Sequence, residues 1–273
     1  MTHKNTIRTL ALAALIAVFG AGQGAYADTS IKESQTEGTT GYNALQIVHG
    51  CETESGKKLP VIAQSVVFPT QNPTVTRVLT TVAAVPATAT TAAVPAQTTE
   101  TATTLAAEIT DPTGLAGKAD LVQDKNIFNK QKKVYDANGN LIGLNGTRGN
   151  LDPNLLGLVP FRFTPVTFKA DSCARRVLVQ IAVADICKQS FPPKAGTANL
   201  WIPAFTGKFT DTAIEGIGAP AVLTIKRNTS KALPAGCPAN ADKDNGDKGY
   251  DVVIAPSAAD VDAHLPIRGY WGR

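Results

Sequence analysis

The feature that most constrains the fold of this chain is a two-residue alternation of apolar and polar side chains. It recurs in short runs between residues 41 and 254. Such alternation is typical of strands, because successive side chains of a strand point to opposite faces. In the clearest run, residues 176–186, aliphatic side chains occupy positions 177, 179, 181 and 183, so we predict a central strand there. No long amphipathic helical pattern competes with it. The sequence therefore predicts an all-β or mostly β fold, sandwich-like, with long irregular loops.

Other strands are predicted by the same alternation or by short apolar runs. The segment 41–51 ends in His49-Gly50-Cys51, and with 61–68 it is expected to form a β-hairpin. The pair Asn138-Gly139 predicts a second hairpin over 134–142. Residues 104–109 favour a short helix. The remaining predicted strands are 74–82, 161–168, 200–203, 219–227 and 250–254.

The first 27 residues have the pattern of a secretory signal peptide. Lys4 and Arg8 precede an apolar stretch over 10–19, which is too short to span a bilayer, and Ala25 and Ala27 fit the small-x-small cleavage rule. We expect Asp28 to be the mature N-terminus, and we expect an exported protein of the periplasm, cell surface or medium. No later apolar run is long enough for a transmembrane helix. Peripheral association with an outer membrane stays open.

Composition divides the rest of the chain into three parts. Residues 28–40 are polar and are expected to be a disordered lead-in. Residues 41–273 are expected to form a single β-rich domain. Within it, residues 83–104 are rich in Ala, Thr, Val and Pro and contain Ala-Ala-Val-Pro-Ala twice, so we predict a long low-complexity surface loop.

The charge balance bears on the class of partner. The chain has 26 Lys and Arg against 22 Asp and Glu, and the leader holds two of the basic residues, which leaves a net charge of +2. No block of basic residues stands out. Nucleic acid is therefore not expected as a partner, because phosphate backbones are bound by clustered Lys and Arg.

Four cysteines predict two disulfide bonds in an exported protein, with three pairings open. Cys51 ends an early strand and Cys173 lies just before the central strand, so we expect these two to face each other. Cys187 leaves the central strand towards the loop of Cys237. The hypothesis is therefore Cys51–Cys173 and Cys187–Cys237.

No catalytic motif of a known enzyme class occurs in the chain, so we expect no enzyme. Metal binding is the alternative chemistry. Beyond the leader the only histidines are His49 and His264, and two neutral imidazoles suit one copper ion. Because the imidazoles must be neutral, binding is expected to weaken below about pH 6.5. The alternative interpretation, without a metal site, is that His49 is an ordinary strand-end residue and His264 an ordinary loop residue.

An acidic segment and two tryptophans are further candidates for a functional role. Residues 240–251 place acidic and amide side chains at some positions of a calcium loop, but the glycine is displaced by one position, and a solvated acidic turn is the simpler interpretation. Trp201 and Trp271 are the only tryptophans. Core packing explains Trp201 best, whereas Trp271 lies near the C-terminus, seven residues after His264.

These residues resemble a known family. The leader, the strand 42–51 ending in His-Gly-Cys, the segment 64–69 and the two histidines are similar to exported, copper-repressible copper-binding proteins of methane-oxidising bacteria. The resemblance implies an irregular β-rich fold and a single copper ion held by two histidines and a kynurenine made from tryptophan. His49 and His264 would be the ligands, and Trp271 or Trp201 the modified residue.

A second resemblance is to copper-binding domains of the YcnI type, which also contain a strand ending in His-Gly-Cys with a later cysteine paired to it. Their copper lies on a histidine at the mature N-terminus, where this chain is expected to have Asp28. Two functions follow as hypotheses. One is an extracytoplasmic copper-binding protein for sequestration or uptake, and the other is a structural or adhesive cell-envelope β-protein without a metal site.

Overall fold

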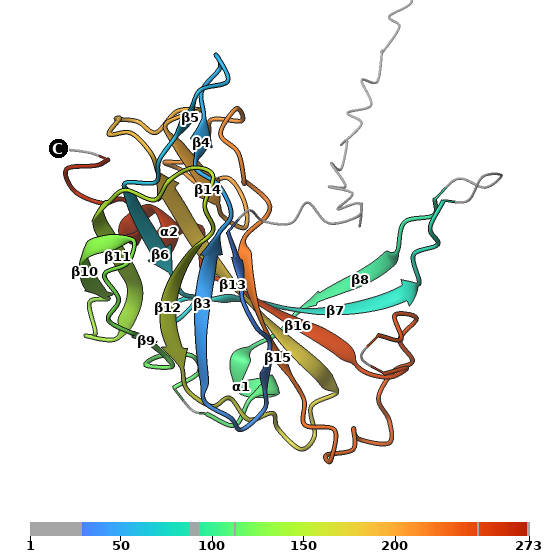
Figure 1. Ribbon diagram of the computed structural model, residues 1–273. Helices are drawn as coiled ribbons and strands as arrows, with labels where there is room; N and C mark the ends of the chain where they lie inside the picture. The colour runs from blue at the N-terminus through green and yellow to red at the C-terminus, as the bar shows by residue number, and fades with distance from the viewer. Residues whose placement is uncertain (1–28, 88–92, 112, 245, 272–273) are drawn as a thin grey trace, which may run out of the picture.

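The computed structural model describes residues 29–271 except 88–92, 112 and 245. The expected signal peptide and Asp28 lie outside the described residues. Strands dominate the described part, with two short helices, so the predicted mostly β, sandwich-like fold is confirmed (Figure 1). Among the described residues, no helix is long and apolar enough to cross a membrane.

Two sheets form the body. The smaller sheet has the strand order β1-β3-β12-β9 and the larger sheet the order β10-β11-β6-β13-β16-β7-β8, with β14, β15 and β2 attached beside it. The bounds of the smaller sheet are β1 Thr29–Ile31, β3 Gly41–Ile47, β9 Ala119–Leu121 and β12 Gly157–Phe163. Those of the larger sheet are β2 Gln35–Thr36, β6 Ala63–Val67, β7 Thr74–Val82, β8 Gln97–Ala102, β10 Phe128–Tyr135, β11 Leu141–Gly149, β13 Ala174–Ile186, β14 Ala198–Trp201, β15 Ala221–Lys226 and β16 Tyr250–Ala255. A separate ribbon pairs β4 Cys51–Glu52 with β5 Lys58–Leu59, and the helices are α1 Leu105–Glu108 and α2 Ala258–His264.

The strand β13 is central, as the sequence predicts, and it changes partners along its length. Its second half pairs with β6 and β14, and its first half pairs with β15 and β16. At a rise of about 3.3 Å per residue, this 13-residue strand spans roughly 40 Å. Features at its two ends are therefore far apart, although the strand joins them.

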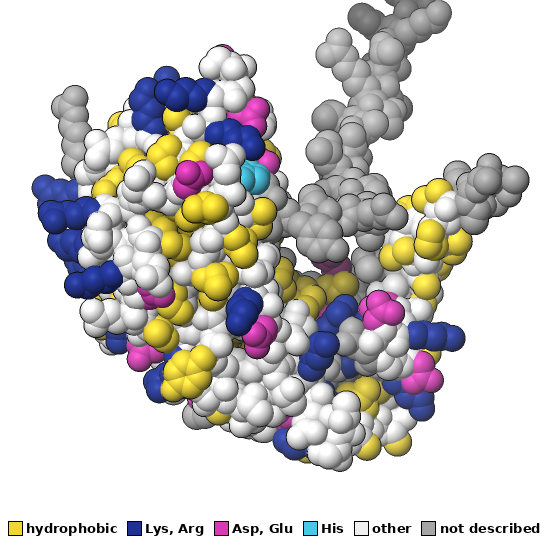
Figure 2. Space-filling view, viewed as in Figure 1, with side chains coloured by type: hydrophobic (Ala, Val, Ile, Leu, Met, Phe, Trp, Pro, Cys, Tyr) yellow, Lys and Arg dark blue, Asp and Glu magenta, His cyan; other side chains and the backbone are white. Residues whose placement is uncertain are grey.

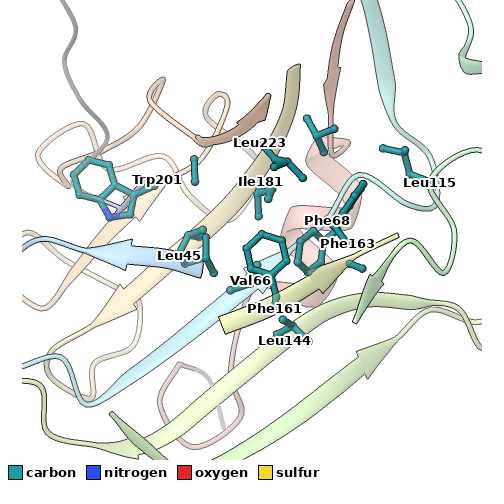
Figure 3. Close-up of a cluster of buried hydrophobic side chains, with 14 of the residues drawn as sticks. Leu45, Val66, Phe68, Leu115, Leu144, Phe161, Phe163, Ile181, Trp201 and Leu223 are labelled. Carbon is teal, nitrogen blue, oxygen red and sulfur yellow. The ribbon is translucent and has the colours of Figure 1, made fainter. Parts of the chain in front are cut away.

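The two faces of β13 belong to two hydrophobic clusters. Its odd-numbered aliphatic residues point to a core between the two sheets, where Leu45 of β3, Val66 of β6 and Phe161 of β12 meet (Figure 3). Its even-numbered residues Ala182 and Ala184 belong to a second cluster on the opposite face of the larger sheet. The second cluster includes Val261, Leu265, Ile267 and Trp271 from α2 and the chain that follows it. The larger sheet therefore separates β3 from α2.

Three expectations about the chain are wrong. β3 and β6 do not form a hairpin, because β3 pairs with β1 and β12 whereas β6 pairs with β11 and β13. Both strands carry apolar residues on a buried face, and they bury these faces against each other across two layers. Residues 29–31 and 35–36 form β1 and β2, so they are not a disordered lead-in. Within the predicted loop 83–104, residues 97–102 form β8, which pairs with β7 in a hairpin that projects from the body (Figure 1).

Two disulfide bonds are present as expected, but the pairing expected from the sequence is wrong. The bonds are Cys51–Cys187 and Cys173–Cys237, not Cys51–Cys173 and Cys187–Cys237. Cys173 and Cys187 lie at opposite ends of β13, and the end of β3 meets the Cys187 end. The expected pairing assumed that the end of this early strand faces the start of the central strand, whereas it faces the end of the central strand.

Candidate functional site

The candidate site lies where β3 ends, at His49, Gly50 and Cys51. The glycine is required there, because a methyl group at Gly50 would lie 1.9 Å from the carbonyl oxygen of Leu59. Cys51 is fully buried and bonded to Cys187 at the end of β13. The disulfide thus fixes the end of β3 against the end of β13. His49, half-buried, has its Nδ1 at 2.5 Å from the carbonyl oxygen of Gly50.

A buried carboxylate lies next to this end of β3. Asp185 of β13 is 1% exposed, and its two oxygens accept hydrogen bonds from three neutral donors. Thr29 Oγ1 donates to Oδ2 at 2.5 Å, Trp201 Nε1 donates to Oδ2 at 2.9 Å, and Gln64 Nε2 donates to Oδ1 at 2.8 Å. We call these four residues the Asp185 cluster. It joins both sheets, because Thr29 comes from the smaller one.

Burial dominates the ionisation of this carboxyl group. Desolvation raises the pKa of Asp185 above its ordinary value, because a charge is costly to hold away from water. The hydrogen bonds from Thr29, Gln64 and Trp201 act in the opposite direction, and so does the charge of His49. His49 is therefore near enough to Asp185 for the two groups to interact electrostatically.

Strand register explains how the cluster is assembled. Asp185 lies opposite Gln64 of β6 on one side and opposite Asn199 of β14 on the other. Residues opposite each other across paired strands project from the same face of a sheet, so the three form a polar row within an apolar core. Gln64 Oε1 and Asn199 Nδ2 are buried without a hydrogen-bond partner among the described residues. Such orphan atoms are rare in protein interiors and are costly.

The structure does not bring the two candidate histidines together. His264 is the last residue of α2, which packs against the face of the larger sheet opposite to β3. His49 follows β3, whose residues Leu45 and Ile47 pack against the other face. Neighbouring layers are about 10 Å apart, whereas copper–nitrogen bonds are of the order of 2 Å. The elements that carry the two histidines thus pack against opposite faces of the larger sheet.

The two tryptophans also lie on opposite faces of the larger sheet. Trp201 is 3% exposed and belongs to the core between the sheets, on the side of His49, where its Nε1 binds Asp185. Trp271 is also 3% exposed, but it lies in the second cluster with α2, in contact with Phe209. Its Nε1 has no hydrogen-bond partner among the described residues. Each histidine thus shares its side of the sheet with one tryptophan.

The acidic segment 240–251 is held by arginines. Asp251 Oδ1 accepts from Arg175 Nε at 2.8 Å and its Oδ2 accepts from Arg176 Nη2 at 2.7 Å. Asp242 Oδ2 accepts from Arg175 Nη2 at 2.7 Å. These carboxylates already have cationic partners, which agrees with a charged turn rather than with a calcium loop.

Sequence reasoning missed the Asp185 cluster. One signal for it exists in the sequence. Asp185 is the only acidic residue in the apolar run 177–186, at an odd-numbered position that continues the inward-facing series. Its partners Thr29 and Gln64 carry no comparable signal, because Thr29 reaches Asp185 through the packing of the two sheets and Gln64 through the pairing of β6 with β13.

Comparisons with protein-family models, with characterised proteins and with solved structures give no match for this chain. The described residues also contain no group of three or more His, Cys, Asp or Glu side chains placed to hold a metal ion. The site must therefore be argued from His49 and its surroundings alone.

Proposed function

We propose that the protein is a non-enzymatic, extracytoplasmic copper-binding protein for sequestration or uptake, and that it binds one copper ion through His49 and not through a pair of histidines. The observation that carries the proposal is the position of His49 beside the buried Asp185 carboxyl, at a strand end fixed by Cys51–Cys187. His264, on the other side of the larger sheet, has no part in this site.

The contact of His49 suits a metal ligand. In the tautomer that donates Nδ1–H to the carbonyl oxygen of Gly50, the imidazole has its lone pair on Nε2. Metal-binding histidines commonly donate their second nitrogen to a carbonyl in this way, which fixes the ring and its tautomer. Imidazole nitrogen is a favoured copper ligand, and a cation bound at His49 would favour the ionised form of the nearby Asp185 carboxyl.

The resemblance to the copper-binding proteins of methane-oxidising bacteria also implies a modified tryptophan. Trp201 is the better candidate for this role, because it lies on the side of His49 and is bonded to Asp185. Trp271 lies on the side of His264. A kynurenine at position 201 would change the mass of its tryptic peptide, which can be measured by mass spectrometry of protein from the native host.

Export is part of the same proposal. Two disulfides are typical of oxidising compartments, and the leader pattern supplies the route. The disulfides and the leader pattern are compatible with a location in the periplasm, at the cell surface or in the medium. They are also compatible with peripheral association with an outer membrane.

Metal analysis and copper titration of purified protein test the proposal. Wild-type protein is expected to bind one copper ion, and His49→Ala to lose it. His264→Ala is the matched control, expected to keep both stoichiometry and affinity. Loss of copper in both variants would contradict the one-histidine site and favour the two-histidine arrangement.

The second candidate is a structural or adhesive cell-envelope protein without a metal site. One observation favours it: all six residues of the outer strand β8 are exposed, in a hairpin that projects from the body (Figure 1). An exposed outer strand can pair with another chain. If wild-type protein binds no copper in titration and carries none from its host, this candidate replaces the first.

A further inference from the structure

A groove of about 620 Å³ lies between the β10–β11 hairpin and the chain that follows α2. Its position is distinct from the Asp185 cluster, and none of its lining residues belongs to that cluster. Figure 2 shows Lys and Arg side chains gathered along the left edge of the molecule, where β10 and β11 lie in Figure 1. The groove is lined by Lys130, Lys132, Lys133, Val134, Tyr135, Asn145, Thr147, Arg148, Pro266, Ile267, Arg268 and Tyr270.

The floor of the groove is a regular piece of sheet. Lys130 lies opposite Thr147, and Lys132 lies opposite Asn145. Since residues two apart on a strand share a face, these two cross-strand pairs project from the same side of the hairpin. The floor thus presents two ammonium groups beside a hydroxyl and an amide, all of which can donate hydrogen bonds.

One wall is set by a strained residue. Arg148 has φ of 57°, the only positive φ among the described non-glycine residues. Its backbone N–H donates to the phenol oxygen of Tyr270 at 3.2 Å, which ties the end of β11 to the opposite wall. A left-handed conformation is unfavourable for arginine, and such strain concentrates at functional positions.

All the charged side chains that line the groove have the same sign. Five lining residues are cationic and none is acidic. Lys133 is paired with Asp120 at 2.5 Å. The other four, Lys130, Lys132, Arg148 and Arg268, form no ion pair within the described residues. Gathering unpaired like charges around one hollow costs stability through mutual repulsion, and an anion would relieve that cost.

Protection of a sheet edge explains only part of this arrangement. β10 is the outer strand of its sheet, and exposed lysines on outer strands discourage pairing with other chains. That role accounts for Lys130 and Lys132. It does not account for Arg148 on β11 or for Arg268 on the facing segment, which direct the positive charge to both sides of one hollow.

We propose that this groove binds a phosphate-bearing ligand. Phosphate oxygens accept hydrogen bonds from lysine and arginine and match the forked geometry of a guanidinium. Lys130 and Lys132 contact the ligand from the floor, and Arg148 and Arg268 contact it from the walls. A free phosphorylated compound and an anionic lipid headgroup share this chemistry.

Two assays on the full-length mature protein distinguish these sources. Calorimetric titration with pyrophosphate probes a free ligand. Cosedimentation with vesicles of phosphatidylglycerol and phosphatidylcholine, compared with phosphatidylcholine alone, probes a headgroup. We expect binding in at least one assay, with affinity that falls as salt rises from about 50 to 200 mM, because screening weakens exposed ion pairs.

The variant Lys132→Gln/Arg268→Gln removes one charge from each side of the groove and is expected to weaken binding at least tenfold. Its matched control is Lys57→Gln/Lys58→Gln, which removes the same charge from the exposed β4–β5 ribbon. The control is expected to bind like wild type, and thermal melts confirm that both variants are folded. Equal losses in both variants, or no binding in either assay, would overturn the proposal.

Discussion

The two ends of β13 hold nearby carboxylates in opposite ways. At the Cys187 end, Asp185 is surrounded by neutral donors, and burial raises the pKa of its carboxyl group. At the Cys173 end, burial also acts to raise the pKa of Asp242, but the amide of Asp244 and the nearby guanidinium groups outweigh it and lower that pKa. At the Cys173 end, the partners of Asp242 thus favour its charged form. At the Cys187 end, burial outweighs the partners of Asp185 and favours its neutral form.

The difference indicates which end has a role beyond stability. Ion pairs such as Arg175–Asp251 fasten the chain that follows Cys237 to β13, and the carboxylates of Asp242 and Asp251 both have arginine partners. Asp185 instead holds its carboxyl group away from water with hydrogen bonds from neutral donors. Proteins tolerate such unfavourable arrangements mainly at functional positions. This supports placing the proposed copper site at the Cys187 end.

Removal of either disulfide bond is expected to lower the free energy of unfolding more than any single substitution described below. In the chain-entropy model, the Cys51–Cys187 bond closes a loop of 136 residues and contributes about 5 kcal/mol, and the Cys173–Cys237 bond, over 64 residues, about 4 kcal/mol. Denaturant unfolding of the two Cys→Ala pairs measures both values. Only loss of Cys51–Cys187 should also weaken copper binding, so equal copper affinity in the two double variants would contradict the proposed division.

Asp251→Asn is expected to lower the free energy of unfolding by about 3 kcal/mol, because it removes the more deeply buried of the two carboxylates that pair with buried Arg175. The side chains of Arg175 and Asp251 are 2% and 7% exposed, so water cannot replace the lost partner. The exposed Asp247→Asn is the control, with an expected change within about 0.5 kcal/mol. Urea denaturation of both variants checks this, and similar values for the two would refute the ion-pair interpretation.

Trp201→Phe is expected to cost about 2 kcal/mol, because it removes a hydrogen bond to a buried carboxylate as well as ring volume. Trp271→Phe is the matched control. It removes a similar volume, but its Nε1 has no hydrogen-bond partner among the described residues, so a smaller loss is expected. Thermal unfolding of the two variants measures the difference, and a larger loss for Trp271→Phe would argue against the importance of the Asp185 cluster.

Asp185→Asn is expected to have the smallest effect at neutral pH, within about 1 kcal/mol of wild type. If the amide of Gln64 turns over, its now unpartnered Oε1 accepts from the new Asn amide, and the other two donors keep an acceptor. Stability of this variant relative to wild type should rise as pH increases above about 4. Above that pH the unfolded carboxyl ionises, whereas the folded one has a raised pKa and resists ionisation.

The change in stability at acidic pH also distinguishes the two ends of β13. Because the folded pKa of Asp242 is lowered, its contribution is present above about pH 4 and is lost as pH falls. Asp242→Asn should therefore be destabilising at neutral pH and approach wild type on acidification. Unfolding measured from pH 3 to 7 tests both variants, and parallel pH profiles for Asp185→Asn and Asp242→Asn would contradict the contrast between the ends.

Local sequence patterns predicted the strands but not their partners. The run 176–186 and the turn at Asn138-Gly139 were predicted correctly, because alternation and turn chemistry act over a few residues. The pairing of Cys51 depends on which layer β3 joins, and no pattern near Cys51 contains that information. α2 was missed because its seven residues are fewer than the roughly 11 to 18 over which helical periodicity can be recognised.

The candidate site shows the same limit. His49 was identified from its place at a strand end, but its proposed partner His264 was chosen only because no other histidine was left. In the proposed site, Asp185 and Trp201 take the place of that partner; β13 and β14 bring them near the end of β3. Residues that meet through packing of two layers cannot be paired from one sequence alone.

Pulsed electron paramagnetic resonance of the Cu(II)-loaded protein tests the central claim most directly, because it counts the imidazoles that bind the ion. We predict nitrogen modulations from a single imidazole, unchanged in His264→Ala and absent in His49→Ala. Modulations from two imidazoles in wild-type protein, reduced to one by His264→Ala, would contradict a site built on His49 alone.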